Sequence, residues 1–280
     1  MSNYNIFCMC LRSHHLQNIK DLGYTPVGLG NQDFSDEWIR DNTGENISYK
    51  NKYYGEYTFY YWFWKNMLEK NIDGNWVGFT GYRYHWGQKK DISSDNLTKQ
   101  INKENFRNYI LKKIPPEWNN YEVVLGEEMR VDNWKISKIL KHGKKKFFLN
   151  PAYFMKKNQN IKLHFDIFHG EGYLDRAISV LDNSEKKDFD EFVKNKNLFH
   201  RENLFFCRSN TLMNRYFQSV FSWLKNCEKL FGFELNGYSR TRIYAFLAER
   251  YISYWFRKYS KPLNWPIFFF DTNKNRVKIK

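Results

Sequence analysis

Short apolar runs separated by polar stretches open the chain. Residues 4–11 (YNIFCMCL) suit a buried strand, and residues 24–30 form a second, glycine-rich run. The strand pattern returns at residues 75–86 and 121–126. Apolar strands that alternate with polar connections predict an α/β domain. Because ligands gather at the carboxyl ends of the strands in open α/β sheets, we expect a site at that edge.

Helical periodicity takes over in longer segments. Residues 54–68 place an aromatic face at helical spacing, made of Tyr57, Tyr60, Tyr61, Trp64 and Leu68. Residues 213–231 repeat the pattern and stop before Gly232, a typical C-cap residue. Residues 240–259 predict another long helix, and a shorter one begins near Gly172. Residues 263–273 indicate a late strand or an extended tail. The C-terminal third is therefore expected to be mostly helical.

The composition fits one folded domain. A chain of 280 residues can bury a substantial core, so we expect a single domain over residues 1–280, with an α/β half (1–130) and a mostly helical half (131–280). The aromatic content of 20% suits both a buried core and partly solvated surfaces that bind a ligand. No secretory signal and no long apolar span is visible, and the four cysteines form no CxxC pair, which favours a reducing cytoplasm.

The charge balance favours polyanionic partners. The chain has 45 Lys and Arg against 30 Asp and Glu, a formal net charge of +15. Nucleic acid, anionic lipid and phosphorylated small molecules all fit such a balance, and a solvated lysine coat fits it equally well. Composition alone leaves these readings open.

Residues 41–66 carry the most distinctive pattern. The run DNTGENIS is followed by YGEYT and YWFWKN, and the next predicted strand reads VGFTGYRY. These motifs resemble a bacterial family from capsule and lipopolysaccharide gene clusters whose domain is named only as domain of unknown function 4422. The runs FFCRSNTLMNRYFQSVFSWL and RIYAFLAERYISYWF resemble the ending of the same family. The resemblance extends roughly over residues 4–256.

The resemblance implies a fold and an activity. Members of the family look like A-type glycosyltransferases, so we expect a GT-A-like mixed sheet flanked by helices, with the nucleotide sugar bound in the 1–130 half and the acceptor side in the helical half. The implied reaction transfers a hexosyl or related group from a nucleotide sugar, with a UDP-sugar favoured, to a glycan or lipid-linked glycan. Two family motifs differ here: H-Y-R-R-Y reads GYRYH at residues 81–85, and Thr-His-Lys after the first strand reads LRSH at residues 11–14.

Arg83 is the first candidate for the leaving diphosphate. Many A-type enzymes use a divalent metal on an Asp-x-Asp after a strand, but the strand that ends in GYRYH has no carboxylate pair. A guanidinium can meet the diphosphate with paired, charge-assisted hydrogen bonds. We therefore expect metal-independent catalysis by Arg83, helped by His85 or Lys65; a divalent metal and a structural ion pair of Arg83 stay open. The Asp-x-Asp at Asp188 and Asp190 lies in a charged helical segment and indicates a solvated face.

The polar loop supplies most of the donor-binding candidates, which are Asp41, Asn42, Asn46, Glu56, Lys65 and Arg12. Asp41, Asn42 and Asn46 suit ribose or sugar hydroxyls, or brace the site from behind. An Asx-turn network that only caps the helix is the alternative. Glu56, in the first turn of the aromatic helix, either interacts favourably with the helix dipole or hydrogen-bonds the ligand. Lys65, at the far end of that helix, could reach a phosphate.

An inverting enzyme also needs a general base near the acceptor hydroxyl, usually a carboxylate. The run HFDIFHGEGYLD supplies Asp166, His169 and Asp175, and its resemblance to a His-containing family segment favours the last two. The glutamates at residues 127–128, after a strand, are further candidates, and each histidine could instead be structural.

Two other charged features have simple structural readings. Glu249 lies in an apolar helix, where a buried ion pair with Arg242 or Arg250 is expected. The run KHGKKK (residues 141–146) could dock on an anionic membrane, each Lys adding about 1 kcal/mol near the surface, or form a solvated loop.

The sequence thus predicts a cytoplasmic glycosyltransferase, peripheral on the inner membrane if the basic segments dock. Its expected partners are a nucleotide sugar and a glycan acceptor, without nucleic acid. Two alternatives stay open. A basic, aromatic-rich nucleic-acid-binding module would stack bases on a charged groove, and an inactive sugar-binding homologue would account for the altered GYRYH motif.

Overall fold

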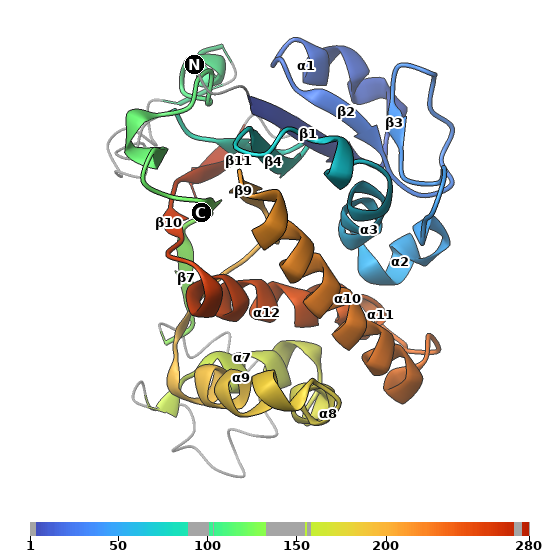
Figure 1. Ribbon diagram of the computed structural model, residues 1–280, viewed down its shortest axis with the longest axis vertical. Helices are drawn as coiled ribbons and strands as arrows, with labels where there is room; N and C mark the ends of the chain where they lie inside the picture. The colour runs from blue at the N-terminus through green and yellow to red at the C-terminus, as the bar shows by residue number, and fades with distance from the viewer. Residues whose placement is uncertain are drawn as a thin grey trace.

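The computed structural model describes residues 4–88, 101–102, 104–132, 155, 158–271 and 276–279. The basic run at residues 141–146, with its proposed membrane role, lies outside the described residues. Figure 1 shows three tiers: a sheet at the top, helices α10 and α12 beneath it, and helices α7, α8 and α9 at the bottom.

The top tier is a seven-stranded mixed sheet with the order β10-β6-β9-β4-β1-β2-β3. Its strands are β1 (Tyr4–Cys10), β2 (Thr25–Gly28), β3 (Ile39–Arg40), β4 (Trp76–Gly81), β6 (Val123–Leu125), β9 (Phe205–Cys207) and β10 (Leu263–Asn264). Only β9 pairs antiparallel with its neighbours, β4 and β6. The parallel strands β1, β2 and β4 therefore end at the same edge of the sheet.

Two smaller sheets extend the structure. The first has the order β12-β11-β5, formed by β5 (Tyr84–Trp86), β11 (Ile267–Asp271) and β12 (Arg276–Ile279). The second pairs β7 (Glu128–Arg130) with β8 (Leu198–His200). The mixed α/β class and the helical C-terminal part predicted from the sequence are confirmed.

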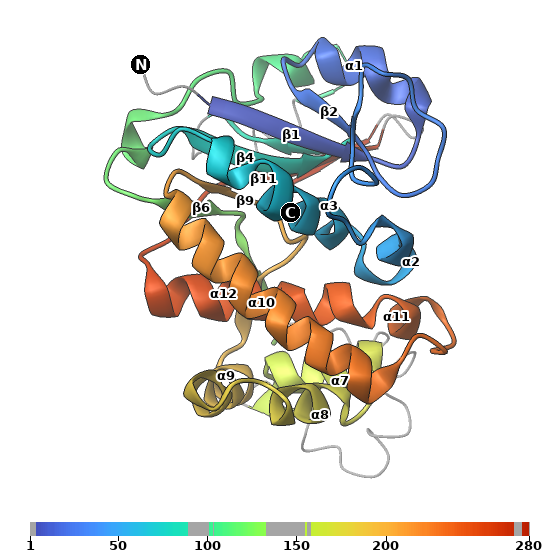
Figure 2. The ribbon, with the colours of Figure 1, turned by 45° about the vertical axis from the view of Figure 1, so that its right-hand side comes forward.

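The helices are α1 (Leu16–Lys20), α2 (Asn51–Tyr54), α3 (Tyr57–Asn66), α7 (Ile161–His169), α8 (Tyr173–Ser179), α9 (Asn183–Asn195), α10 (Asn210–Phe231), α11 (Tyr238–Thr241) and α12 (Ile243–Tyr259). Figure 2 shows α3 between the strands and α10. On one side of α3, the ring of Phe63 lies 5.4 Å from that of Phe79 in β4. On the other side of α3, the ring of Trp64 stacks on that of Phe221 in α10 at 5.8 Å. The aromatic block after the polar loop is thus core that joins the sheet to the helices.

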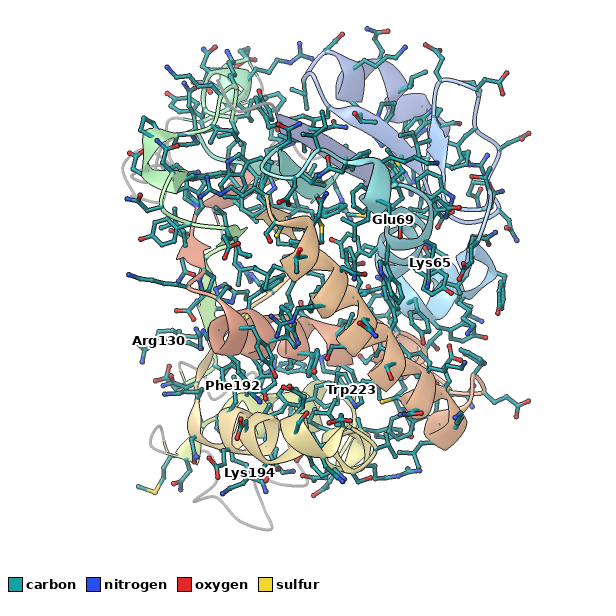
Figure 3. All side chains as sticks on the ribbon, in the orientation of Figure 1. Lys65, Glu69, Arg130, Phe192, Lys194 and Trp223 are labelled. Carbon is teal, nitrogen blue, oxygen red and sulfur yellow. The ribbon has the colours of Figure 1, made fainter. Side chains whose placement is uncertain are left out.

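The bottom tier packs on the middle one through large aromatic side chains. Trp223 of α10 donates its indole N–H to the carbonyl of Ala177 in α8 at 2.7 Å. The ring of Phe192 in α9 lies 5.9 Å from Tyr254 of α12. Figure 3 shows Trp223 and Phe192 between the two tiers. The Asp-x-Asp of α9 lies on an outer face, where Asp190 pairs with Lys194 at 2.6 Å, as a solvated helix predicts.

Three predicted elements differ in the structure. The helix expected over residues 54–68 breaks at Gly55, whose φ of 58° ends α2 before α3 begins. The strand expected over residues 75–86 divides into β4 and β5. The segment before the helix expected near Gly172 is helical as well and forms α7, capped by Asn160, whose side chain accepts from the N–H of Leu163. Gly232 ends α10 as predicted, with φ of 62°.

Candidate active site

A cavity of about 290 Å³ opens at the carboxyl ends of β1, β2 and β4, between this edge of the sheet and the start of α12. We call it the strand-end cavity. Its polar and charged lining comprises Asn51, Glu56, Tyr82, Arg83, Tyr84, Glu202, Asn203, Tyr238, Arg242 and Glu249. This is the edge at which open α/β sheets bind ligands. The cavity lies near the lower limit of typical small-molecule pockets, which start at about 300 Å³.

Arg83 reaches the cavity because the chain turns between β4 and β5. The hydroxyl of Thr80 donates to the carbonyl of Tyr84 at 2.6 Å, which closes the turn, and the N–H of Phe270 holds the carbonyl of Arg83 at 2.8 Å. The guanidinium lies 5.1 Å from the ring of Tyr82 and 5.2 Å from that of Phe269. Its Nε is buried without a hydrogen-bond partner among the described residues. Arg83 thus lines the cavity with a guanidinium that is incompletely hydrogen-bonded.

A second guanidinium, that of Arg242, enters from the start of α12. Its Nη2 lies 3.5 Å from Oε2 of Glu56, and its Nε has no hydrogen-bond partner among the described residues. The break at Gly55 makes room for it, because a Cβ on Gly55 would lie 2.4 Å from Nη2 of Arg242. The cavity therefore joins cations from two distant segments of the chain.

Three carboxylates line the same cavity. Glu56 accepts from the side-chain amide of Asn203 at 2.6 Å, and burial raises its pKa, an effect that Arg242 opposes. Glu249 forms an ion pair with Arg250 and accepts from the N–H of Glu202 at 2.8 Å. Burial also raises the pKa of Glu249. The ion pair expected for Glu249 is confirmed, with Arg250 as the partner.

The third carboxylate, that of Glu202, comes from the connection between β8 and β9. Glu202 and Asn203 have φ of 74° and 56°, in the left-handed region that non-glycine residues rarely occupy. The carboxylate of Glu202 accepts a hydrogen bond from the hydroxyl of Tyr84 and lies 3.8 Å from Nε of Arg201. The local sequence RENL carries one weak signal, because Asn is enriched in the left-handed region, whereas the positive φ of Glu202 depends on long-range contacts such as the hydrogen bond to Glu249.

The structure gives Asp41 a bracing position. It is fully buried, and its Oδ1 accepts from the N–H of Gly30 at 2.8 Å while Oδ2 accepts from the hydroxyl of Thr58 at 2.6 Å. Thr58 in turn accepts from the side-chain amide of Asn51, which lines the cavity, at 3.0 Å. Burial raises the pKa of Asp41. Asp41 therefore supports the cavity from behind, one of the two roles that the sequence left open.

The other residues of the polar loop lie away from the cavity lining. Asn42 is exposed, and Asn46 closes an Asx turn by accepting from the N–H of Ser48 at 3.2 Å. Lys65, labelled on α3 in Figure 3, has its ammonium 3.8 Å from the ring of Trp64 and 3.9 Å from Glu45. Arg12 is exposed just after β1, near the cavity residue Leu11. Of the donor-binding candidates, only Glu56 lines the cavity directly.

His85 points into the protein interior. It is 3% exposed and lies among aromatic rings, including those of Phe106 and Phe268, each 5.5 Å away. Burial lowers the pKa of His85 to about 3, so the imidazole is neutral at physiological pH. The pairing of β5 with β11 turns it away from Arg83, and the structure does not bring the two side chains together at the cavity.

The general-base candidates of the helical part also lie outside the cavity lining. Lys162 pairs with Asp166 at 3.2 Å and with Asp175 at 2.7 Å, so these carboxylates neutralise a lysine between α7 and α8. His169 is 7% exposed, stacks on Phe246 at 4.0 Å and lies 3.2 Å from Nη2 of Arg250. Burial and the nearby Arg250 lower the pKa of His169 to about 2.

Three further findings bear on earlier expectations. Glu128 of β7 pairs with Arg257 and does not line the cavity. Within the described ranges, no group of three or more His, Cys, Asp or Glu side chains is arranged to hold a metal ion. The expected metal-independent catalysis stays a prediction. In the same part of the chain, no helix is long and apolar enough to span a bilayer.

Comparison with known families supplies the identification. Residues 6–261 match the model of the domain of unknown function DUF4422. The chain belongs to the DUF4422 family. This membership confirms the family suggested by the motifs at residues 41–66, while the gene-cluster context of that family stays a prediction for this chain.

The DUF4422 fold is similar to a solved structure, the apo form of the WbbM bifunctional glycosyltransferase. The TM-score is 0.58 at 17% sequence identity, and the match covers 96% of this chain but 45% of WbbM. The chain thus spans less than half the length of that protein, and the likeness shows a shared fold. A search of curated proteins found no match.

Sequence reasoning missed Glu202, Asn203 and Arg242 as cavity residues. The sequence pattern indicates Arg242 only as a partner of Glu249, yet Arg242 pairs with Glu56, which lies 186 residues earlier in the chain. The one available signal was composition: glutamate and asparagine directly before the apolar strand β9. That signal is weak, because polar residues commonly precede strands.

Proposed function

We propose that this DUF4422 protein is a glycosyltransferase that binds a nucleotide sugar in the strand-end cavity and transfers the sugar to a glycan acceptor. The observation that carries the proposal is the placement of two incompletely hydrogen-bonded guanidiniums, Arg83 and Arg242, beside three carboxylates at the carboxyl edge of the sheet. A diphosphate needs cationic donors, and sugar hydroxyls suit carboxylate acceptors. The fold shared with WbbM supports the same class.

Arg83 has the leading chemical role in this proposal. As the bond between the anomeric carbon and the diphosphate oxygen breaks, negative charge grows on the leaving group. A guanidinium already fixed by the turn between β4 and β5 stabilises that charge without reorganising. Arg242 assists from the opposite wall, where Glu56 orients it.

The finer features follow from the family resemblance. We propose a hexosyl or related donor, with UDP-sugars as the first to test, and an acceptor in capsule or lipopolysaccharide synthesis, glycan or lipid-linked. On this proposal the protein works in the cytoplasm and meets lipid-linked acceptors at the anionic inner membrane. Catalysis proceeds on Arg83 without a divalent metal.

The test is a donor-hydrolysis screen over nucleotide sugars, with and without EDTA, followed by Arg83→Ala and Arg83→Lys. Removal of one preorganised donor to a developing charge typically costs about 100- to 1000-fold in rate. We expect Arg83→Ala to lose that much, and Arg83→Lys to recover only part of it because an ammonium lacks the planar fork. Arg107→Ala is the matched control, since Arg107 is an exposed arginine paired with Asp21.

Titration of nucleotides and oligonucleotides separates the remaining possibilities. Binding of UDP or GDP without turnover would indicate an inactive homologue, and preferential, steeply salt-dependent oligonucleotide binding would indicate a nucleic-acid module. Strict dependence on Mn²⁺ would refute the metal-free role of Arg83. Full activity of Arg83→Ala would refute its place at the diphosphate.

A further inference from the structure

A second cavity, of about 440 Å³, lies at the short helix α11. Its polar and aromatic lining includes His169, Tyr173, Asn236, Tyr238, Ser239 and Arg240. We call it the α11 cavity. Helix α11 packs against α7, and Figures 1 and 2 show it at the level between α2 and the bottom tier. The volume falls within the range of small-molecule pockets, about 300–1,000 Å³.

Two features join the α11 cavity to the strand-end cavity. Tyr238 lines both cavities. Phe246 lines the strand-end cavity, and its ring stacks at 4.0 Å on that of His169, which lines the α11 cavity. A molecule bound in the α11 cavity is therefore adjacent to one bound in the strand-end cavity, with Tyr238 at the boundary.

Tyr238 is held in place at this boundary and is nevertheless open to solvent. It is 72% exposed, the highest value among the large hydrophobic residues that the structure describes as exposed. The guanidinium carbon of Arg242 lies 5.7 Å from the centre of its ring, and the ring of Phe246 meets it edge-on at 6.3 Å. A single exposed ring needs no explanation by itself. A ring fixed between two cavities, however, offers a ready surface to a ligand.

The lining of the α11 cavity suits a sugar. Asn236 supplies an amide, Ser239 a hydroxyl and Arg240 a guanidinium. Within the described part of the chain, none of these three side chains has a hydrogen-bond partner, so all three can bind a ligand. Sugar hydroxyls both donate and accept hydrogen bonds, and they therefore match a mixed set of amide, hydroxyl and guanidinium groups. The apolar C–H face of a sugar ring packs on an aromatic ring such as that of Tyr238.

We infer that the α11 cavity binds the glycan acceptor, with a sugar ring packed on Tyr238 and its hydroxyls hydrogen-bonded by Asn236, Ser239 and Arg240. This inference rests on the proposed glycosyltransferase function, because it takes the strand-end cavity as the donor site. The boundary at Tyr238 then places the acceptor sugar beside the donor sugar.

The experiment measures how the enzyme divides its donor between a sugar acceptor and water. The donor is the best nucleotide sugar from the hydrolysis screen, and the acceptors are p-nitrophenyl glycosides of common hexoses and N-acetylhexosamines at concentrations below saturation. Tyr238→Ala removes the ring, so we expect the ratio of transfer to hydrolysis to fall about 10-fold. Tyr238→Phe keeps the ring and should keep the ratio.

The ratio isolates acceptor binding from other effects. It compares two reactions of the same bound donor, so an unfolded fraction, or a general loss of activity through the neighbouring Arg242, leaves it unchanged. Asn236→Trp, at an exposed position, fills the α11 cavity with a bulky ring and should lower the ratio as well. Tyr49→Ala is the matched control, since Tyr49 is 68% exposed and lies 5.6 Å from the ammonium of Lys50.

The outcomes separate this inference from the proposed function. If the wild type neither binds nor turns over any nucleotide sugar, the proposed function fails and the inference with it. If the wild type hydrolyses a donor but no glycoside receives the sugar, only the acceptor assignment is overturned. The same holds if either Tyr238→Ala or Asn236→Trp keeps the wild-type ratio, or if Tyr49→Ala lowers it equally.

Discussion

Two connections of this protein hold an acidic side chain at the same end of the sheet and use it in opposite ways. In the loop at residues 41–48, Asp41 is fully buried and both its oxygens accept hydrogen bonds from the protein. In the connection at residues 201–204, the backbone is held and the carboxylate of Glu202 faces the cavity.

The two connections differ in which residues adopt unfavourable backbone conformations. The loop at residues 41–48 uses turn-forming residues in conformations they favour, with the one positive φ at Gly44. The connection at residues 201–204 puts positive φ on Glu202 and Asn203, and hydrogen bonds from α3 and α12 compensate. The buried Asp41 therefore braces the fold, whereas the Glu202 side chain, which is 24% exposed, lines the strand-end cavity.

The largest expected effect concerns the support of the strained connection. Glu249→Ala removes the partner of Arg250, which is 1% exposed, and leaves a buried charge uncompensated. We expect a loss of roughly 3–5 kcal/mol in the free energy of unfolding, measured by urea denaturation. A loss below about 1 kcal/mol would mean that the pair does not support the connection.

The second prediction addresses the buried acid. Asp41→Ala leaves two buried donors, the N–H of Gly30 and the hydroxyl of Thr58, without their acceptor. We expect a cost of roughly 2–4 kcal/mol in urea denaturation. The milder Asp41→Asn should keep its nucleotide affinity in calorimetry. Weaker binding at an unchanged Tm would instead give Asp41 a direct ligand role and end the contrast between the two connections.

The third prediction uses pH. Burial lowers the pKa of His85 from 6.5 to about 3, so the unfolded chain takes up a proton that the native protein does not. Stability is therefore lost as the pH falls from 6.5 toward 3, by about 2 kcal/mol for this group at pH 5. His85→Phe should remove that share of the acid sensitivity while keeping donor hydrolysis. Loss of hydrolysis in a folded His85→Phe protein would restore the catalytic helper role that the sequence suggested.

The smallest effect is expected at Lys65. Its side chain is 29% exposed, and its contacts are the Trp64 ring and a 3.9 Å pair with Glu45. Lys65→Ala should cost less than about 1 kcal/mol of stability, since exposed ion pairs and cation–π contacts are weak. Nucleotide affinity should be unchanged in calorimetry. A marked loss of affinity would place phosphate at the far end of α3 instead of at Arg83.

The candidate site was only partly predictable. The turn at GYRYH and the edge of the sheet led to Arg83, because strand patterns and ligand positions in α/β sheets follow general rules. His85, two residues further, was misplaced because the break between β4 and β5 depends on pairing with β11, far along the chain. His169 and Asp175 resembled site residues but pack at α7 and α8, beyond the cavity lining.

The sequence by itself determined the α/β class, the strands β1, β2, β4 and β6, the long helices α10 and α12 and the end of α10 at Gly232, because periodicity and capping are local properties. Tertiary structure alone decided that Gly55 divides a helix to admit Arg242, and that Glu202 and Asn203 take left-handed conformations at the cavity. These features arise from contacts between segments up to about two hundred residues apart, which no local pattern encodes.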